Sequence, residues 1–258
     1  MSLPEAPPPV LALRNLQKRY GPKVAVEDLS LDVPAGSMLG LLGPNGAGKT
    51  TTLAMTTGLL RPDAGTAWVL GADVWHDPPA AKARMGVLPD GVRMFDRLTG
   101  SELLRCNGLL RGMGEAEVAS RSAELLDALS LSEAGSTLVV DYSAGMKKKI
   151  GLACALIHAP RLLILDEPLE AVDPVSGETI RQILRAFVAG GGTVVLSSHV
   201  MELVESLCDR VAILAQGRLL AYGSLDEVRG GTSLQQRFLS LVGAHDLGEE
   251  TLSWLRSS

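Results

Sequence analysis

The chain has few cysteines and no long apolar run, and each shortage excludes a class of protein. Cys106, Cys154 and Cys208 are far apart. Their spacing fits neither a disulfide framework nor a metal knuckle, so we interpret them as small core residues in a reducing compartment. No apolar run approaches the roughly 20 residues that cross a bilayer, and the N-terminus lacks a signal-peptide pattern. We therefore expect a cytoplasmic chain that reaches a membrane only through a partner.

Positive charge is also in short supply. The 258 residues include 24 Lys and Arg against 29 Asp and Glu, for a net charge of −5. Broad nucleic-acid binding needs a basic face, so no nucleic-acid partner is expected. Hydrophobic residues make up 46% and charged residues 21%, which is typical of a globular protein with a substantial core.

Short apolar strands alternate with helical patterns over most of the chain, which predicts an α/β fold with a mostly parallel, covered sheet. Residues 10–20 and 25–33 read as an N-terminal antiparallel β subdomain around a turn at Gly21-Pro22. Further strands are predicted at 38–42, 66–70, 85–88, 162–165, 193–196, 211–214 and 218–222. Helices are predicted at 51–60, 101–110, 115–129, 143–158, 175–188 and 200–207.

The domain organisation follows from these patterns. Residues 1–9 contain four prolines and predict a disordered leader. Residues 10–230 form the main domain, in which 91–159 is an inserted α-helical subdomain. Residues 231–258 read as a C-terminal helical tail, to which we assign no chemistry.

A glycine-rich loop links the predicted strand 38–42 to the next helix. It matches the P-loop pattern, in which glycines turn the backbone so that N–H groups face phosphate oxygens and the helix adds its dipole. Lys49 would reach the β- and γ-phosphates, and the Thr50 hydroxyl would bind Mg²⁺. The alternative interpretation is a glycine-rich connector. The predicted nucleotide-binding residues here are Gly43, Pro44, Asn45, Gly46, Ala47, Gly48, Lys49, Thr50 and Thr51.

Two adjacent acids follow the buried strand 162–165. Ligands gather at the carboxyl ends of parallel strands, so Asp166 and Glu167 suit a metal–phosphate site. We expect Asp166 to hold Mg²⁺, directly or through water, and Glu167 to orient or deprotonate the attacking water. The alternative is an ordinary strand end with solvated acids. Together with the loop, the pair predicts a P-loop NTPase core that binds and hydrolyses a nucleotide.

Several further motifs, in order and at suitable spacing, extend the pattern. Tyr20 precedes the loop, Tyr142-Ser-Ala-Gly-Met146 lies ahead of the acid pair, Leu169-Glu-Ala-Val-Asp173 follows it, and His199 comes after the strand 193–196. Over roughly residues 8 to 230 the chain resembles the ATP-binding subunits of ABC transporters. The Tyr-Ser-x-Gly-Met form of the second motif resembles the signature of exporter-type ATPases that pair with separate membrane subunits.

The resemblance implies a role for each motif. Tyr20 would stack on adenine, Asp173 would belong to the D-loop, and His199 would contact the γ-phosphate. Ser143 would cap the next helix, whose end would meet the nucleotide of a second copy or paralogous subunit. The signature residues implied are Ser143, Ala144, Gly145 and Met146.

The same resemblance implies a head-to-tail dimer with two ATP molecules between the copies. The helical subdomain would receive a transmembrane permease, so the chain would lie on the inner face of the membrane and power transport, as export.

Two positions depart from the family's pattern. Ala144 and Met146 replace a glycine and a glutamine of the signature. Asp90 stands where the family has the Q-loop glutamine. An ionised Asp accepts hydrogen bonds only, so Asp90 is predicted to keep a metal role and to alter coupling to the partner. The run Lys147 to Lys149 is open between a solvated face and a phosphate role.

Two other functions fit parts of the sequence. One is a soluble ABC-type ATPase acting on nucleic acid or ribosomes, which would usually carry two cassettes, a coiled coil or a basic arm. The other is an interaction protein with a decayed nucleotide site. The second disagrees with the presence of Lys49, Thr50, Asp166, Glu167 and His199.

Overall fold

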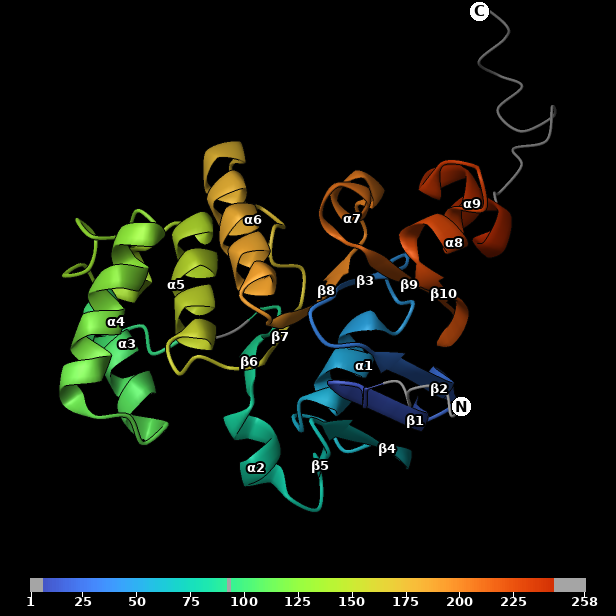
Figure 1. Ribbon diagram of the computed structural model, residues 1–258, viewed down its shortest axis with the longest axis horizontal. Coiled ribbons are helices and arrows are strands. Elements are labelled where there is room, and N and C mark those ends of the chain that lie inside the picture. Colours follow the sequence, from blue (N-terminus) through green and yellow to red (C-terminus); the bar gives the residue numbers. More distant parts are fainter. Residues whose placement is uncertain (1–6, 92–93, 244–258) are drawn as a thin grey trace, which may run out of the picture.

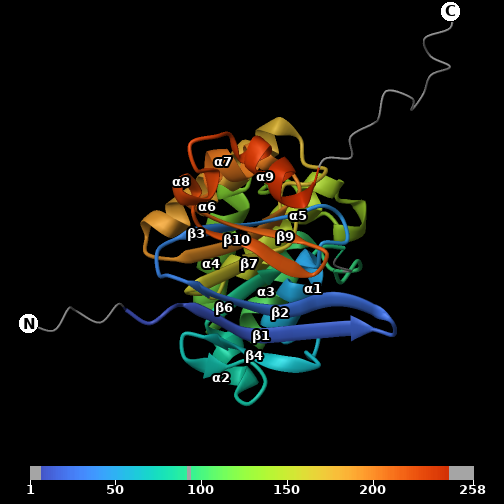
Figure 2. The ribbon, with the colours of Figure 1, turned by 90° about the vertical axis from the view of Figure 1, so that its right-hand side faces the viewer.

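The computed structural model describes residues 7–91 and 94–243, and within them the chain forms two β-sheets (Figures 1 and 2). The larger sheet consists of β3 (Met38–Leu42), β6 (Met85–Leu88), β7 (Leu162–Leu165), β8 (Thr193–Ser198), β9 (Arg210–Ala215) and β10 (Arg218–Ser224). Its strand order is β10-β9-β3-β8-β7-β6. All neighbours pair in parallel except β10 and β9, which confirms the predicted mostly parallel sheet.

The smaller sheet is antiparallel and confirms the predicted N-terminal β subdomain. It consists of β1 (Leu11–Tyr20), β2 (Lys23–Val33), β4 (Ala64–Val69) and β5 (Ala72–Asp73), in the order β2-β1-β4-β5. β1 and β2 form a hairpin in which Tyr20 pairs with Lys23 across Gly21-Pro22. This turn places Tyr20 at the tip of a long ribbon.

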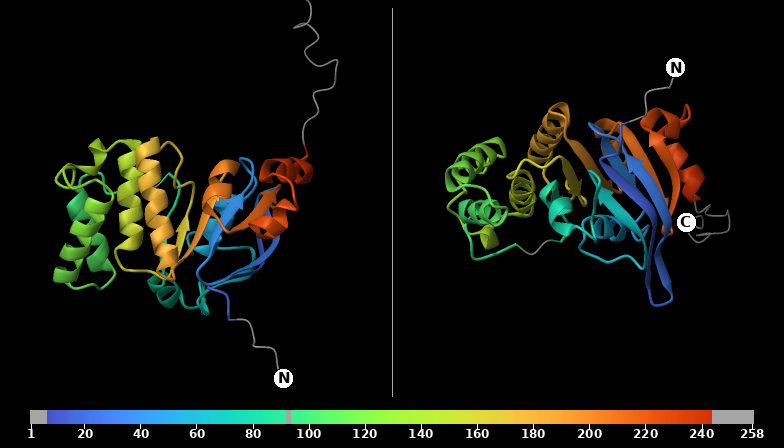
Figure 3. Two further views of the ribbon diagram at one scale, coloured as in Figure 1. Left: turned by 45° about the horizontal axis from the view of Figure 1, so that its top comes forward. Right: turned by 60° about the horizontal axis from the view of Figure 1, so that its bottom comes forward.

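The helices lie beside the sheets and at one end of the molecule. Their bounds are α1 Lys49–Thr56, α2 Pro78–Ala83, α3 Gly100–Leu110, α4 Glu115–Ala128, α5 Ala144–Leu156, α6 Pro174–Ala189, α7 Met201–Leu207, α8 Leu225–Arg229 and α9 Leu234–Val242, with a 3₁₀ turn at Val139–Asp141. Figure 3 shows the green helices α3 and α4 at the end away from the antiparallel sheet. Both helices lie within residues 91–159, the range predicted for an inserted helical subdomain.

Alternate side chains of the central strands enter two different core layers. In β7, Leu163 and Leu165 pack with residues of α5, α6 and α7. Leu162 and Ile164 instead pack with α1 and the antiparallel sheet. Successive strand side chains point to opposite faces, so a wholly apolar strand can be buried on both. The sheet therefore fixes the strand ends that carry the acid pair.

Some elements differ from their predicted bounds. The helix predicted at 51–60 is α1, which begins at Lys49 and ends at Thr56 because Gly58 adopts a left-handed φ of 73°. α2 and β5 were not predicted. The start of α2 has a local signal, since Asp77 caps it and Pro78 occupies its first turn. Of the predicted leader and tail, residues 1–6 and 244–258 lie outside the described residues.

Within the described part of the chain, no helix combines the length and apolar character needed to cross a membrane.

Candidate functional site

The glycine-rich loop runs from the end of β3 into α1 and lines a cavity. Gly48 is the N-cap of α1 with φ 104°, a conformation that side chains of L-residues rarely adopt. A Cβ at Gly48 would lie 2.4 Å from the Ala25 carbonyl oxygen. The loop therefore needs glycine here both for its turn and for its approach to β2. The first turn of α1 faces the cavity with unpaired N–H groups, the arrangement that binds phosphate.

Lys49 is the first residue of α1 and is buried, with only 7% of its side chain exposed. Its Nζ donates to the Gly43 carbonyl oxygen at 2.7 Å and lies 3.5 Å from Glu167 Oε1. A buried ammonium needs acceptors, and the loop supplies two, since Lys49 Nζ also donates to the Pro44 carbonyl oxygen at 3.5 Å. The position of Lys49 beside the loop suits an anionic ligand.

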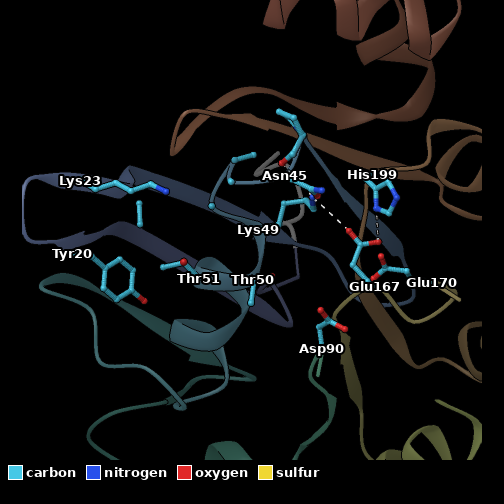
Figure 4. Close-up of a pocket in the computed structure, with 15 residues that line it drawn as sticks. Tyr20, Lys23, Asn45, Lys49, Thr50, Thr51, Asp90, Glu167, Glu170 and His199 are labelled. Atoms are coloured by element: carbon cyan, nitrogen blue, oxygen red, sulfur yellow. Dashed lines mark hydrogen bonds and ion pairs between the residues drawn. The ribbon is translucent and has the colours of Figure 1, made fainter. Parts of the chain in front are cut away.

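The cavity has a volume of about 360 Å³. Figure 4 shows Tyr20, Lys23 and Thr51 at one end and Glu167 and His199 at the other. Tyr20 is 51% exposed, so its ring is free to stack on a planar ligand. The lining brings together most of the predicted nucleotide-binding and catalytic residues, although not Gly43, and adds Lys23, Ala25 and Glu170, which were not predicted as site residues. Its members are Tyr20, Lys23, Ala25, Pro44, Asn45, Gly46, Ala47, Gly48, Lys49, Thr50, Thr51, Asp90, Glu167, Glu170 and His199.

The acid pair is anchored by one hydroxyl from the neighbouring strand. Asp166 is 3% exposed at the end of β7. Ser197 of β8 donates its hydroxyl to Asp166 Oδ1 at 2.5 Å and accepts from the Glu167 N–H at 2.8 Å. Ser197 was not among the predicted site residues. Its signal was a polar residue following the apolar strand 193–196, beside the strand that carries the acids.

Glu167 is held by groups on both sides of its carboxylate. Its backbone φ is 46°, which is uncommon for a residue other than glycine. Its Oε2 lies 3.1 Å from His199 Nδ1, and its Oε1 faces Lys49 (Figure 4). His199 is 41% exposed, whereas Glu167 is 12% exposed. The predicted lysine, glutamate and histidine therefore meet at one point.

Thr50, Asp90 and Asp166 share a second, smaller cavity of about 50 Å³. Their oxygen atoms are the ligand type that Mg²⁺ prefers. Within the described residues, no group of three His, Cys, Asp or Glu could hold a metal ion. Two carboxylates and one hydroxyl around one cavity suit a metal bound partly by protein oxygens and partly by substrate phosphates.

The signature segment lies at the start of α5. Ser143 caps α5 by accepting the Met146 N–H at 3.2 Å, as the sequence predicted. Gly145 lies close to Asp173, whose carboxylate would be 3.5 Å from a Cβ there. Asp173 caps α6, and the Ser176 N–H is the main cause that lowers the pKa of its carboxyl. Among the described residues, Ser143 to Met146 are not part of the cavity lining.

The basic run on α5 is not a uniform solvated face. Lys149 is buried, with 7% exposed. Lys147 Nζ donates to the Val140 carbonyl oxygen at 3.2 Å. Lys148 Nζ donates to the Glu167 carbonyl oxygen at 2.8 Å and contacts Asp90 Oδ1 at 3.3 Å. The run thus divides into three different environments that its sequence did not distinguish.

Comparison with known proteins identifies the class to which this site belongs. The profile of the ABC transporter family matches residues 26–170. A solved structure titled "Structure of ATP binding subunit of ABC transporter" superposes with a TM-score of 0.84 at 31% identity, covering 90% of this chain and 99% of that one. The chain therefore belongs to the ABC transporter family, as one of its ATP-binding subunits, which are ATPases. This confirms the predicted family, fold and activity.

Several curated proteins are similar along most of the chain. The daunorubicin/doxorubicin resistance ATP-binding protein DrrA of Streptomyces peucetius is 40% identical over 91% of this chain and 71% of its own. The linearmycin resistance ATP-binding protein LnrL of Bacillus subtilis is 37% identical over 90% of this chain and 75% of its own. The Nod factor export ATP-binding protein I of Cupriavidus metallidurans is 38% identical over 85% of this chain and 72% of its own.

Proposed function

We propose that this ATPase works as a head-to-tail dimer, of itself or with a paralogous subunit, that powers export through a separate transmembrane subunit. The similar proteins named for drug resistance and for Nod factor export support the direction of transport. The observation that carries the proposed site is the meeting of Lys49, Glu167 and His199 at the mouth of the phosphate loop. The chain would then sit on the cytoplasmic face of the membrane, bound to its permease.

The predicted signature residues lie apart from the nucleotide cavity of their own copy, and this supports the dimer. The cavity is lined by the loop, the acid and the histidine, whereas Ser143, Ala144, Gly145 and Met146 begin a helix elsewhere. Ser143 and Ala144 are exposed. In a head-to-tail pair, the exposed start of α5 would close over the phosphates bound by the other copy, and Asp173 would lie at the same interface.

ATP would lie along the cavity from Tyr20 to His199. Tyr20 would stack on adenine, and the backbone N–H groups of residues 43–51 would surround the phosphates. Lys49 would neutralise the β- and γ-phosphates. Thr50, Asp166 and Asp90 would hold Mg²⁺, and their shared cavity fits this assignment. When bound, the ion would neutralise charge on the phosphates during transfer.

Glu167 would act as the base. Its carboxylate would accept a proton from water, the water oxygen would bond to the γ-phosphorus, and the bond to the β-phosphate oxygen would break to release ADP and phosphate. His199 would orient Glu167 and contact the γ-phosphate. Hydrolysis would remove the group that joins the two copies and let them separate. The helical region 91–159 would pass that movement to the permease.

The Glu167→Gln variant tests the base directly. An amide keeps the shape of the side chain but cannot accept the proton, so kcat should fall by about 100-fold or more. ATP affinity, measured by fluorescence titration with Mg²⁺ present, should stay within twofold, which is about 0.4 kcal/mol. A variant that hydrolyses ATP at the wild-type rate would remove Glu167 from this role.

A further inference from the structure

The backbone of Glu167 is held in place by two side chains from other elements. Glu167 has a left-handed φ of 46°, a backbone conformation that costs a residue other than glycine about 1 kcal/mol or more. The Glu167 N–H donates to Ser197 Oγ at 2.8 Å, and its carbonyl oxygen accepts from Lys148 Nζ at 2.8 Å and, less closely, from the Glu170 N–H at 3.3 Å. Both polar groups of one strained peptide residue are thus fixed from outside its own strand. The two side-chain bonds fix the backbone from which the Glu167 side chain extends toward His199 and Lys49.

Lys148 also joins three segments that are distant in the sequence. It lies on α5, contacts Asp90 after β6 at 3.3 Å, and reaches Glu167 after β7. Its side chain is only 17% exposed. Asp90 balances the ammonium charge, and charge-assisted hydrogen bonds of this kind are stronger than neutral ones. This contact accounts for an acid at position 90 independently of any metal.

Neither role first considered for the basic run describes Lys148. A solvated lysine would be mostly exposed, and this one is not. Within the described residues, Lys148 does not line this copy's nucleotide cavity, and a side chain only 17% exposed is not free to bind a partner's phosphates. Its donors instead serve a carbonyl and a carboxylate beside the cavity.

We propose that Lys148 is a positioning residue that holds Glu167 in its hydrolytic orientation, with Asp90 as its charge partner. The proposal rests on the proposed function of Glu167 as the base. Lys148 follows Ser143 by little more than one helical turn on the same rigid helix. Ser143 would serve the partner's ATP, whereas Glu167 serves this copy's own. When the dimer closes and the start of α5 meets the partner's ATP, Lys148 would therefore transmit the movement of α5 to Glu167 in this copy's own site.

The test replaces Lys148 with Met, which keeps the length of the side chain and removes its donors. A misplaced catalytic group can cost about 100-fold, so kcat should fall by about tenfold to 100-fold. KM and ATP affinity should stay within about twofold, because no phosphate contact is lost. Lys148→Arg, which can still donate to the carbonyl, should retain clearly more activity than Lys148→Met.

Lys18→Met is the matched control. Lys18 Nζ donates to the Arg61 carbonyl oxygen at 2.9 Å and to Asp63 at 2.8 Å, away from the cavity. Its side chain is 15% exposed and its carboxylate partner 46%, against 17% and 46% for Lys148 and Asp90. The two Met variants should lower the unfolding temperature to a similar extent. Only Lys148→Met should lower kcat.

Three results would overturn the positioning role. The first is a Lys148→Met enzyme whose kcat stays within twofold of the wild type. The second is a matching loss of ATP affinity, which would indicate phosphate binding instead. The third is a Lys148→Arg enzyme no better than Lys148→Met. Glu167→Gln in the same assay separates the two proposals: if it is inactive while Lys148→Met is normal, only the positioning role fails.

Discussion

At the scale of single residues, one hydroxyl couples the predicted metal ligand to the predicted base. The Ser197 hydroxyl has a single proton, which it donates in a hydrogen bond to Asp166. Its oxygen accepts a hydrogen bond from the Glu167 N–H. Both partners lie at the end of β7, so the hydroxyl fixes one carboxylate and the other residue's backbone together. Asp166 is buried, and the loss of this donor would leave its carboxylate less well satisfied.

Ser197→Ala should therefore weaken both the fold and catalysis. We expect the free energy of unfolding to fall by about 2 kcal/mol, the worth of a hydrogen bond to a charged group, and kcat to fall as well. Urea unfolding and steady-state ATPase rates measure the two effects. Ser198→Ala is the control. Ser198 is similarly buried, but its hydroxyl forms hydrogen bonds with the carbonyl oxygen and the N–H of Val200. An equal loss of kcat in both variants would contradict the account.

Asp90 is the second residue whose exchange is informative. Gln can both donate and accept a hydrogen bond, whereas ionised Asp only accepts. Asp90→Gln should leave ATP binding without metal intact. If Asp90 helps to hold Mg²⁺, the Mg²⁺ concentration for half-maximal ATPase activity should rise by about tenfold. Unchanged nucleotide affinity together with an unchanged ATPase rate and Mg²⁺ dependence would exclude the metal role.

At the scale of elements, the end of α5 is sensitive to acid. His158 follows α5, and its Nε2 lies 3.0 Å from the Met85 carbonyl oxygen of β6. Burial is the largest cause that lowers the pKa of His158, to about 4, and the nearby Arg111 charge adds to it. The neutral ring therefore fits the fold, and protonation opposes it.

The sign of the pH effect follows from that lowered pKa. The unfolded chain binds this proton near pH 6.5 and the folded chain only near pH 4. The contribution of neutral His158 to stability is therefore complete above about pH 6.5 and is lost as the pH falls from there through about 4. His158→Gln, which keeps a donor for Met85, should flatten that loss in unfolding curves at several pH values. The exposed His76→Gln serves as the control, and equal slopes in the two variants would refute the assignment.

The elements show why some parts of the fold could be predicted and others could not. The strands 38–42, 85–88 and 162–165 were predicted correctly because each is a short apolar run bounded by clear turn signals. α2 escaped prediction because it is short and only Ala81 in it is buried. The predicted end of α1 was too late because Gly58, which adopts a left-handed φ of 73°, was included in the helix rather than used as a stop signal.

At the scale of the whole molecule, the same contrast applies to the site. The residues 43–50, Asp166, Glu167 and His199 were predicted because their chemistry is written in short motifs at the ends of strands. The contacts of Lys148 with Asp90 and Glu167 were not predictable, because they join positions 58 and 19 residues apart. Ser197 likewise reaches across 31 and 30 residues. Such partners emerge only when the two core layers bring β6, β7, β8 and α5 together.

In the proposed dimer, each copy supplies half of a site that the other copy completes. Sedimentation velocity on Glu167→Gln, which should hold ATP without cleaving it, tests this sharing. With ATP and Mg²⁺ this variant should sediment as a dimer, and without ATP as a monomer.

The matching variant is Glu167→Gln combined with Ser143→Arg. It should bind ATP with unchanged affinity and remain a monomer, because the start of α5 can no longer close over the partner's phosphates. If that double variant still dimerises on ATP, or if Glu167→Gln binds ATP and stays monomeric, the shared site is contradicted.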